Sequence, residues 1–328
     1  MLRVLAALLA AALAADSTRA AEATPLILET RIPLGAVSGR IDHLAFDPKR
    51  NRLYVAELAN NSVGIVDAKT RRLIRTVPGL EEPQGIGYEP TTDTIYVANG
   101  GDGSVRVFSG SDFALLDTIA LGKDADNVRI DAATHRVYVG YGDGALAVID
   151  PMTRKRIADI SLYGHPEGFQ LDPGGDVIFV NVPDATHIAV ISRKSARQVA
   201  AWTTGTFRSN YPLALDPAGG RIIAVFRRPA HLQSFEIRTG RQLSGIGICA
   251  DSDDLFADAK RKRVYIICGQ GYVDVLDSSG DRYAVAGRFA SSEGSRTGLF
   301  VAELDRLFVA IRATQAEAAA LWVLRPNE

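Results

Sequence analysis

The sequence lacks several features that mark particular classes of protein. Its 328 residues carry 37 Lys and Arg against 38 Asp and Glu, and the formal net charge of −1 gives no basic excess for binding nucleic acid. There is no Gly-X-Ser-X-Gly elbow, no His-Glu-X-X-His helix and no phosphate-binding Gly-Lys-Ser loop. These absences weaken the case for an enzyme without excluding one, because some active sites are assembled from widely spaced loops.

The one long apolar run lies at the N-terminus. Residues 4–15 are twelve uncharged apolar residues that follow Arg3, and small residues flank the end of the run. A helix of that length spans about 18 Å, short of the ~30 Å hydrocarbon core of a membrane. We therefore expect residues 1–20 to be a secretory signal peptide cleaved near 14–21. The expected protein is periplasmic or secreted, without a membrane anchor or a nucleic-acid partner.

The rest of the chain, residues 25–328, consists of seven similar units. In each unit a strand-like segment ends at an acid or its equivalent, and an aromatic-Val-Ala-like strand follows about seven residues later. The marker positions recur every 41 to 44 residues, at Asp47, Glu89, Asp131, Asp172, Asp216, Asp258 and Val301. Each acid precedes a turn, so its expected role is in the hairpin rather than in chemistry. Such a period points to a β-propeller.

The pattern within a unit indicates four strands, for example 42–47, 52–57, 62–67 and 73–77. The last unit supplies only three, at 297–302, 306–312 and 319–324. The segment 26–34 has strand composition, and we expect it to complete the last blade and remove the open edges. The predicted fold is all-β: one seven-bladed propeller of four-stranded antiparallel blades, closed by its N-terminal strand.

The second unit contains Tyr96-Val97-Ala98-Asn99-Gly100, followed by the strand 104–108. These motifs resemble the bacterial YVTN-repeat (YncE-like) seven-bladed propellers over roughly residues 36–325. The resemblance implies the propeller fold and an exported protein. It implies little about activity, since fold does not define function.

Equivalent positions just before each innermost strand should converge on one mouth of the central channel. There the units diverge into polar and ionisable residues, as expected if each blade contributes a different group to one site. No catalytic residue is assigned. The candidate ligand-binding residues are Arg40, Asp42, His43, Gln84, Asp126, Asn127, Arg129, His165, Glu167, Asn210, Tyr211, Asp253, Asp254 and Arg296.

Four carboxylates in one mouth would repel one another unless a cation were shared among them. Asp42, Asp126, Glu167 and Asp253 are therefore candidate ligands for a divalent cation, Ca²⁺ or, with a histidine, Zn²⁺. Two alternatives stay open: the acids cap loops in a solvated channel, or they pair with the neighbouring arginines.

The two cysteines, Cys249 and Cys268, lie at the same end of one hairpin. In an oxidising compartment they are expected to form a disulfide, with two independent buried thiols as the alternative.

The function expected from these observations is a binding or interaction scaffold for a small molecule or a periplasmic protein, acting as a monomer. The alternatives are a metal-dependent hydrolase similar to the propeller lactonases and, with less support, a quinoprotein dehydrogenase.

Overall fold

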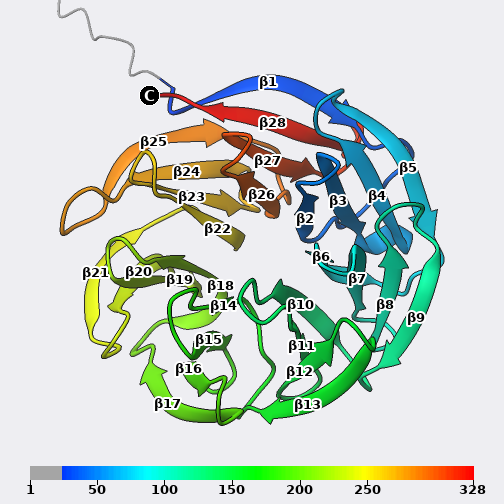
Figure 1. Cartoon of the computed structure of the whole chain (residues 1–328). Helices are drawn as coiled ribbons and strands as arrows, with labels where there is room; N and C mark the ends of the chain where they lie inside the picture. The colour runs from blue at the N-terminus through cyan, green and yellow to red at the C-terminus, as the bar shows by residue number, and fades with distance from the viewer. Residues whose placement is uncertain (1–23) are drawn as a thin grey trace, which may run out of the picture.

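The structure is a computed structural model that describes residues 24–328, so the expected signal peptide lies outside the described residues. Within that range, 28 strands form seven four-stranded antiparallel sheets arranged around a central axis (Figure 1). The predicted seven-bladed propeller is confirmed. No helix in the described part of the chain is long and apolar enough to cross a membrane.

Each blade runs from an innermost strand to an outermost one. Blade 1 consists of β2 (Leu44–Asp47), β3 (Arg52–Glu57), β4 (Ser62–Asp67) and β5 (Arg72–Pro78). Blade 2 consists of β6 (Pro83–Glu89), β7 (Thr94–Asn99), β8 (Ser104–Ser109) and β9 (Leu115–Ala120). Blade 3 consists of β10 (Ala125–Ile130), β11 (Val137–Tyr141), β12 (Ala145–Asp150) and β13 (Lys155–Ser161). Blade 4 consists of β14 (Phe169–Leu171), β15 (Val177–Val182), β16 (His187–Ser192) and β17 (Arg197–Thr203). Blade 5 consists of β18 (Arg208–Asp216), β19 (Arg221–Arg228), β20 (Ala230–Glu236) and β21 (Gln242–Gly247). Blade 6 consists of β22 (Ser252–Asp258), β23 (Arg263–Cys268), β24 (Tyr272–Asp277) and β25 (Ala284–Ala290). Blade 7 consists of β26 (Gly298–Val301), β27 (Arg306–Ile311), β28 (Ala320–Pro326) and β1 (Leu26–Pro33). A short 3₁₀ helix, η1 (Leu58–Asn60), joins β3 to β4.

The ring closes as the sequence predicts. β1 pairs antiparallel with β28 from Leu26 opposite Pro326 to Pro33 opposite Ala320, and it forms the outer edge of blade 7 (Figure 1). The Glu29 carboxylate of β1 accepts two hydrogen bonds of 2.8 Å from Arg306 and one of 2.6 Å from Arg71 of blade 1. The closing strand is thus tied to its own blade and to the next one.

The repeated acids act in the hairpin turns, as expected. The Asp47 carboxylate accepts a hydrogen bond from the backbone N–H of Arg50, and Asp258 accepts the corresponding bond from Arg261. The side chains of Arg50 and Arg261 then reach an aspartate of the next blade, Arg261 contacting Asp305. Carboxylate acceptors stabilise these turns by capping backbone donors, and the arginines link adjacent blades.

The core lies between the blades. The recurring tyrosines Tyr54, Tyr96, Tyr138 and Tyr265 are at most 5% exposed, and each packs in an apolar cluster with a neighbouring strand set. Burial of these large rings between sheets contributes favourably to blade packing. Their packing role is therefore confirmed.

Blades approach most closely around the channel. A Cβ atom built on Gly168 would lie 2.5 Å from the carbonyl oxygen of Tyr211, and one built on Gly85 would overlap the carbonyl oxygen of Asp126. Glycine at these two positions lets the next blade come near enough for the Gly168 N–H to donate to the Tyr211 carbonyl oxygen at 3.0 Å. This contact fixes the residues beside the channel.

Candidate functional site

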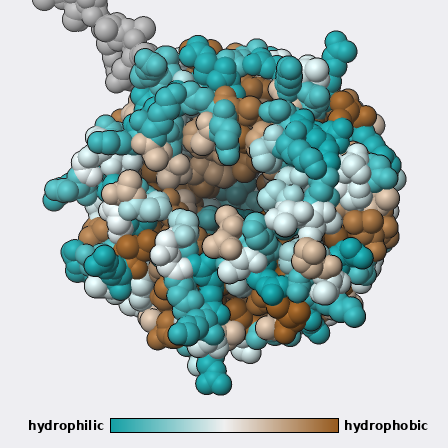
Figure 2. Space-filling model, in the orientation of Figure 1, coloured by the Kyte–Doolittle hydropathy of each residue, from teal (hydrophilic) through white to brown (hydrophobic). Residues whose placement is uncertain are grey.

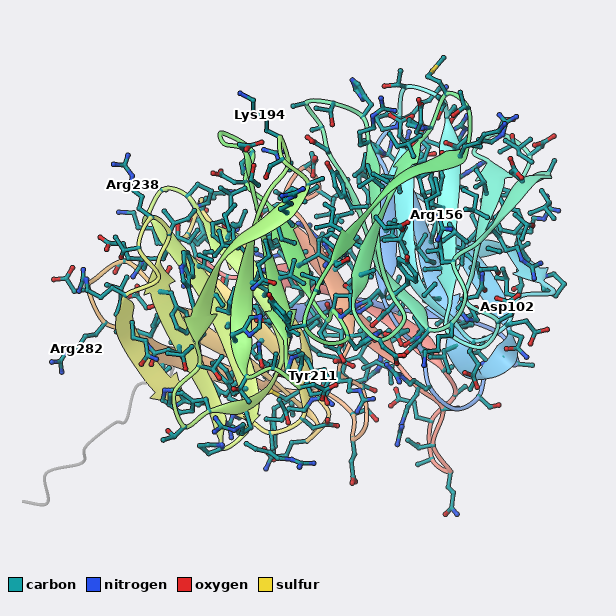
Figure 3. The ribbon with its side chains drawn as sticks, turned by 90° about the horizontal axis from the view of Figure 1, so that it is seen from below. Asp102, Arg156, Lys194, Tyr211, Arg238 and Arg282 are labelled. Carbon is teal, nitrogen blue, oxygen red and sulfur yellow. A yellow bond between two sulfur atoms is a disulfide. The ribbon has the colours of Figure 1, made fainter. Side chains whose placement is uncertain are left out.

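The segments that enter the innermost strands form the rim of a cavity of about 250 Å³ at one mouth of the channel. In the side view Tyr211, on this rim, lies at the opposite edge of the ring from Lys194 in the β16–β17 turn (Figure 3). The view along the axis shows the ring hollowed at its centre (Figure 2). The cavity is lined by Arg40, Gln84, Asp124, Asp126, His165, Glu167, Tyr211, Arg227, Asp253 and Arg296.

One side of the mouth is organised around Asp253 on β22. Its carboxylate lies 2.7 Å from Arg227 Nη2 and 2.9 Å from Arg296 Nε, and Arg40 approaches at 3.8 Å. Asp251 completes the cluster, 3.1 Å from Arg296 Nη1. The Arg227 guanidinium also lies 4.1 Å from the centre of the Tyr211 ring, a cation–π distance. Charges of both signs are therefore fixed on this side.

Asp42 lies behind the rim and is fully buried. Arg40 Nη2 is 2.7 Å from its carboxylate, and His43 Nε2 is 3.8 Å away. Burial raises the pKa of Asp42 to about 7, against the lowering effect of the His43 and Arg40 charges. Asp42 therefore supports the rim from behind and does not line the cavity.

His43 is held between two carboxylates, with its Nδ1 3.2 Å from Asp254. Burial by itself lowers the pKa of His43, but the charges of Asp254 and Asp42 raise it to about 10. The imidazolium form is therefore the stable one at neutral pH.

The other side of the mouth comes from blades 2 to 4. His165 Nδ1 contacts the Gly142 carbonyl oxygen at 2.6 Å, and the ring faces Asp124 at 3.7 Å and Asp126 at 4.0 Å. Burial lowers the pKa of His165, but Asp126, the Gly142 carbonyl and Asp124 raise it to about 9. For Asp126, burial acts to raise the pKa, and His165 and His43 bring it below its usual value. An ionised Asp126 therefore faces a protonated His165.

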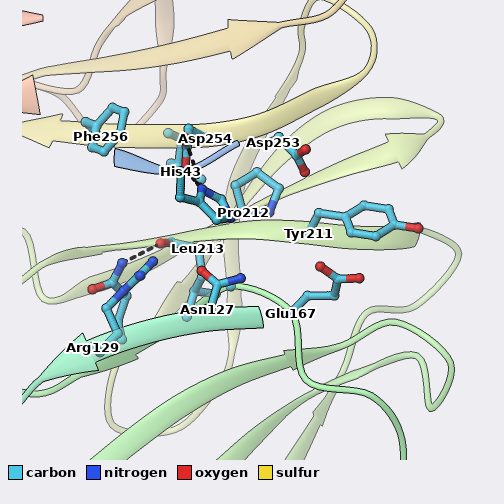
Figure 4. A pocket seen from close by; sticks show the side chains of 13 residues that line it. His43, Asn127, Arg129, Glu167, Tyr211, Pro212, Leu213, Asp253, Asp254 and Phe256 are labelled. Atoms are coloured by element: carbon cyan, nitrogen blue, oxygen red, sulfur yellow. Dashed lines mark hydrogen bonds and ion pairs between the residues drawn. The ribbon is translucent and has the colours of Figure 1, made fainter. Parts of the chain in front are cut away.

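Glu167 differs from the other carboxylates. Within residues 24–328 no Lys, Arg or His nitrogen lies within 4 Å of it, and its side chain makes no hydrogen bond. Its carboxyl shares the space below the Tyr211 ring (Figure 4). Burial, and then the charges of Asp126 and Asp253, raise the pKa of Glu167 to about 8. Glu167 therefore holds a proton at neutral pH.

A smaller chamber of about 30 Å³ lies deeper in the channel. Its polar lining includes His43, Asn127, Arg129 and Asp254, together with Glu167 (Figure 4). Arg129 Nε donates to the Phe169 carbonyl oxygen at 3.1 Å, and burial lowers its pKa. Glu167 lines both spaces and so lies at their junction.

The structure separates the predicted site residues into four groups. Eight line the mouth cavity: Arg40, Gln84, Asp126, His165, Glu167, Tyr211, Asp253 and Arg296. Four line the deeper chamber, namely His43, Asn127, Arg129 and Asp254, and Asp42 is buried behind the rim. Asn210 reaches neither space: it is fully buried and donates to Asn181 Oδ1 at 2.9 Å, because its side chain turns into the packing between blades 4 and 5.

Three residues of the mouth are absent from the predicted set. Asp124 and Asp251 each stand two residues before a predicted acid, so they could have been found by extending the aligned segment. Arg227 lies near the end of β19, and the strand registers of blades 5 and 2 make it equivalent to Gly100. A charged residue at a position where blades 2, 3 and 6 have glycine was the available indication.

The predicted disulfide is present. Cys249 and Cys268 are bonded, with Cα atoms 5.9 Å apart. The bond ties the end of β23 to the segment that leads into β22. Asp251 lies in that segment, and Asp253 follows it on β22. It therefore fixes the backbone beneath the arginine cluster.

The predicted metal site stays a prediction. Within residues 24–328 no three His, Cys, Asp or Glu side chains come close enough together to hold a metal ion. Asp42 and Asp253 pair with arginines, and Asp126 faces a histidine. The repulsion expected among Asp42, Asp126, Glu167 and Asp253 is relieved by these basic groups and by the proton on Glu167.

No protein-family model and no curated protein matches the chain. Similar solved structures include a chain of the hydrazine synthase of Kuenenia stuttgartiensis, with a TM-score of 0.73 and 18% identity over 83% of this chain and 95% of that one. A chain from the mitotic checkpoint complex has a TM-score of 0.78 and 14% identity over 99% of each chain. At such identities the similarity shows the fold alone: the chain is a seven-bladed β-propeller.

Proposed function

We propose that this chain is an exported, monomeric propeller of the YVTN-repeat type that binds a small ligand at the mouth of its channel. The observation that carries the proposal is the cavity of about 250 Å³ whose lining comes from all seven blades and is almost entirely charged. Concave sites with convergent polar groups and displaced pKa values are the usual places of ligand binding. The cavity is smaller than a drug-sized pocket, so the ligand is small.

Two further observations support this proposal. The arginines and acids of the mouth hold one another in place, and a preorganised site loses less conformational entropy when it binds. The disulfide suits an oxidising compartment, which agrees with the export expected from residues 1–20. The lining has no paired nucleophile and base of the kind that acyl transfer requires, which favours binding over catalysis.

The test uses the full chain expressed in a bacterial host and recovered from the periplasm. The probes are amines, amino acids, carboxylates, phosphate and neutral sugars, scored by thermal shift and confirmed by calorimetry. At least one probe class should bind, and Tyr211→Ala should weaken its affinity at least about tenfold, since this side chain lines both spaces.

Tyr163→Ala is the matched control because Tyr163 is 79% exposed and lies outside both cavities. Binding that is equal in the two variants would place the ligand elsewhere. If no probe class binds, the proposal fails.

A further inference from the structure

The rim of the mouth has two chemically different halves. Tyr211, Arg227, Asp253, Arg296 and Arg40 come from blades 5, 6, 7 and 1 and form what we call the arginine half. Gln84, Asp124, Asp126, His165 and Glu167 come from blades 2 to 4 and form the acidic half. All three arginines of the rim are therefore on one side.

The arginine half is balanced. Arg40 pairs with Asp42 at 2.7 Å, and Arg227 and Arg296 share Asp253 and Asp251 at 2.7 to 3.3 Å. Three guanidinium groups thus face three carboxylates in a fixed arrangement. A ligand is not needed to neutralise this half.

The acidic half is not balanced. His165 is its one basic side chain, and it faces both Asp124 and Asp126 at distances longer than a hydrogen bond. Glu167 has no basic partner among the described residues. The charged groups that act on it are Asp126, Asp253 and His43 from other blades and His165 from its own segment.

A second observation points to a missing donor at the same place. Asn127, which lines the chamber with Glu167, is 2% exposed, and its Oδ1 accepts no hydrogen bond from the described protein. Figure 4 shows Asn127 beside the channel close to Glu167. A buried acceptor without a donor is costly, so a ligand that brings a donor to this place would satisfy the Asn127 oxygen.

We infer that the mouth binds a small organic cation whose primary ammonium group lies against Glu167 and donates to its carboxylate and to the Asn127 amide oxygen. This inference rests on the proposed function and names the ligand class for that site. An ammonium group carries three donors and a positive charge, and it complements the excess of acceptors in the acidic half. A charge-assisted hydrogen bond of this type is stronger than one between neutral groups.

The test measures putrescine binding by calorimetry at pH 8.5, where Glu167 is mainly ionised and the amine is still protonated. 1,4-Butanediol is the uncharged analogue. The native protein should bind the diamine and not the diol, and Glu167→Gln should weaken diamine affinity at least about tenfold. Affinity should also fall at pH 6.5, since a proton then competes with the ligand for the carboxylate.

The controls separate this inference from a folding defect. Glu303→Gln removes an exposed carboxylate outside the site and should bind normally. Glu167→Asp keeps the charge, so this variant should bind the diamine more tightly than Glu167→Gln. If Glu167→Gln fails to fold, Glu167→Asp should still fold and can be tested in its place.

The remaining outcomes are distinct. Equal diamine binding by native protein and Glu167→Gln overturns the assignment to Glu167. Binding of a different probe class that is lost in Tyr211→Ala overturns this inference and leaves the binding function intact. If no probe of any class binds, both proposals are refuted.

Discussion

Replacement of Glu29 by Gln is the sharpest test of how the ring is held closed. The Glu29 side chain is 17% exposed, and its carboxylate is contacted by Arg306, Arg71 and Arg325. Gln keeps the shape and one acceptor but loses the charge and the paired contact with Arg306. Charge-assisted hydrogen bonds contribute about 1.5–3 kcal/mol when buried, and exposed ion pairs about 0.2–1 kcal/mol. Because the three arginines remain partly solvated, we expect a loss of about 2 kcal/mol.

The assay is chemical and thermal unfolding of native protein, Glu29→Gln and the exposed-site control Glu303→Gln. A loss of about 2 kcal/mol corresponds to a fall of roughly 3 °C in Tm for a chain of this size. Burial acts to raise the pKa of Glu29, but hydrogen bonds from Arg306 and the other arginines lower it further than burial raises it. Its stabilisation is therefore complete above the unfolded-state pKa of about 4.3 and is lost as pH falls through the lower folded-state pKa.

The difference between native protein and Glu29→Gln should accordingly be full at pH 7 and shrink below about pH 4. Equal unfolding midpoints for Glu29→Gln and Glu303→Gln at pH 7 would refute the reasoning. A difference that stayed constant down to pH 2.5 would show that the charge of Glu29 is not its cause.

Two other substitutions probe the frame of the mouth. Replacing Cys249 and Cys268 by Ser opens a loop with a sequence separation of 19 and should lower the free energy of unfolding by about 3 kcal/mol. Reductant should destabilise the native protein and leave the variant unchanged. A variant as stable as the native protein would contradict this prediction. Gly168→Ala places a Cβ against the Tyr211 carbonyl oxygen and should cost about 1–3 kcal/mol in urea unfolding. Gly247→Ala, where the added Cβ meets no atom within 4 Å, should be close to neutral, and equal effects of the two would rule out the proposed steric cause.

The blade framework could be predicted from the sequence because its determinants are local and repeated. The turn acid recurs in six units and the buried tyrosine after it in four, with the same spacing, so their roles can be inferred from the repeat. The strand at 26–34 was identifiable for a different reason, since the last unit had one strand too few. Repetition thus supplied both the fold and its closure.

The positions of the mouth could also be predicted, but the state of each side chain could not. Asp42 and His43 precede β2 in the structure, whereas the strand was expected to begin at Asp42. The register of β18 shifts between Asn210 and Leu213, where the strand bulges, and Asn210 points into the packing between blades while Tyr211 lines the channel. Spacing within a repeat gives the place of a residue on its blade, and side-chain direction depends on such local irregularities.

The pairing of the acids in the mouth was unpredictable for the same reason. Four carboxylates at equivalent positions suggested a shared cation, because like charges in one cavity must be offset. The negative charge of Asp253 is instead balanced by Arg227 and Arg296. Arg227 lies on β19, the second strand of its blade, and not on the aligned segment before the innermost strand. Whether an acid is paired depends on contacts between blades, and these contacts have no counterpart in the repeat.

Glu167 gains its significance from this same pairing. In a mouth where every other carboxylate has a basic neighbour within 4 Å, the one without such a neighbour is the position where a ligand's charge has the largest effect. Gly168 follows it directly and cannot accept a side chain without displacing the next blade. The backbone at Glu167 is therefore fixed by packing between blades, while its carboxyl is left without a partner. A rigid frame with one unpaired carboxyl supports the proposed binding site over a purely structural ion-pair network.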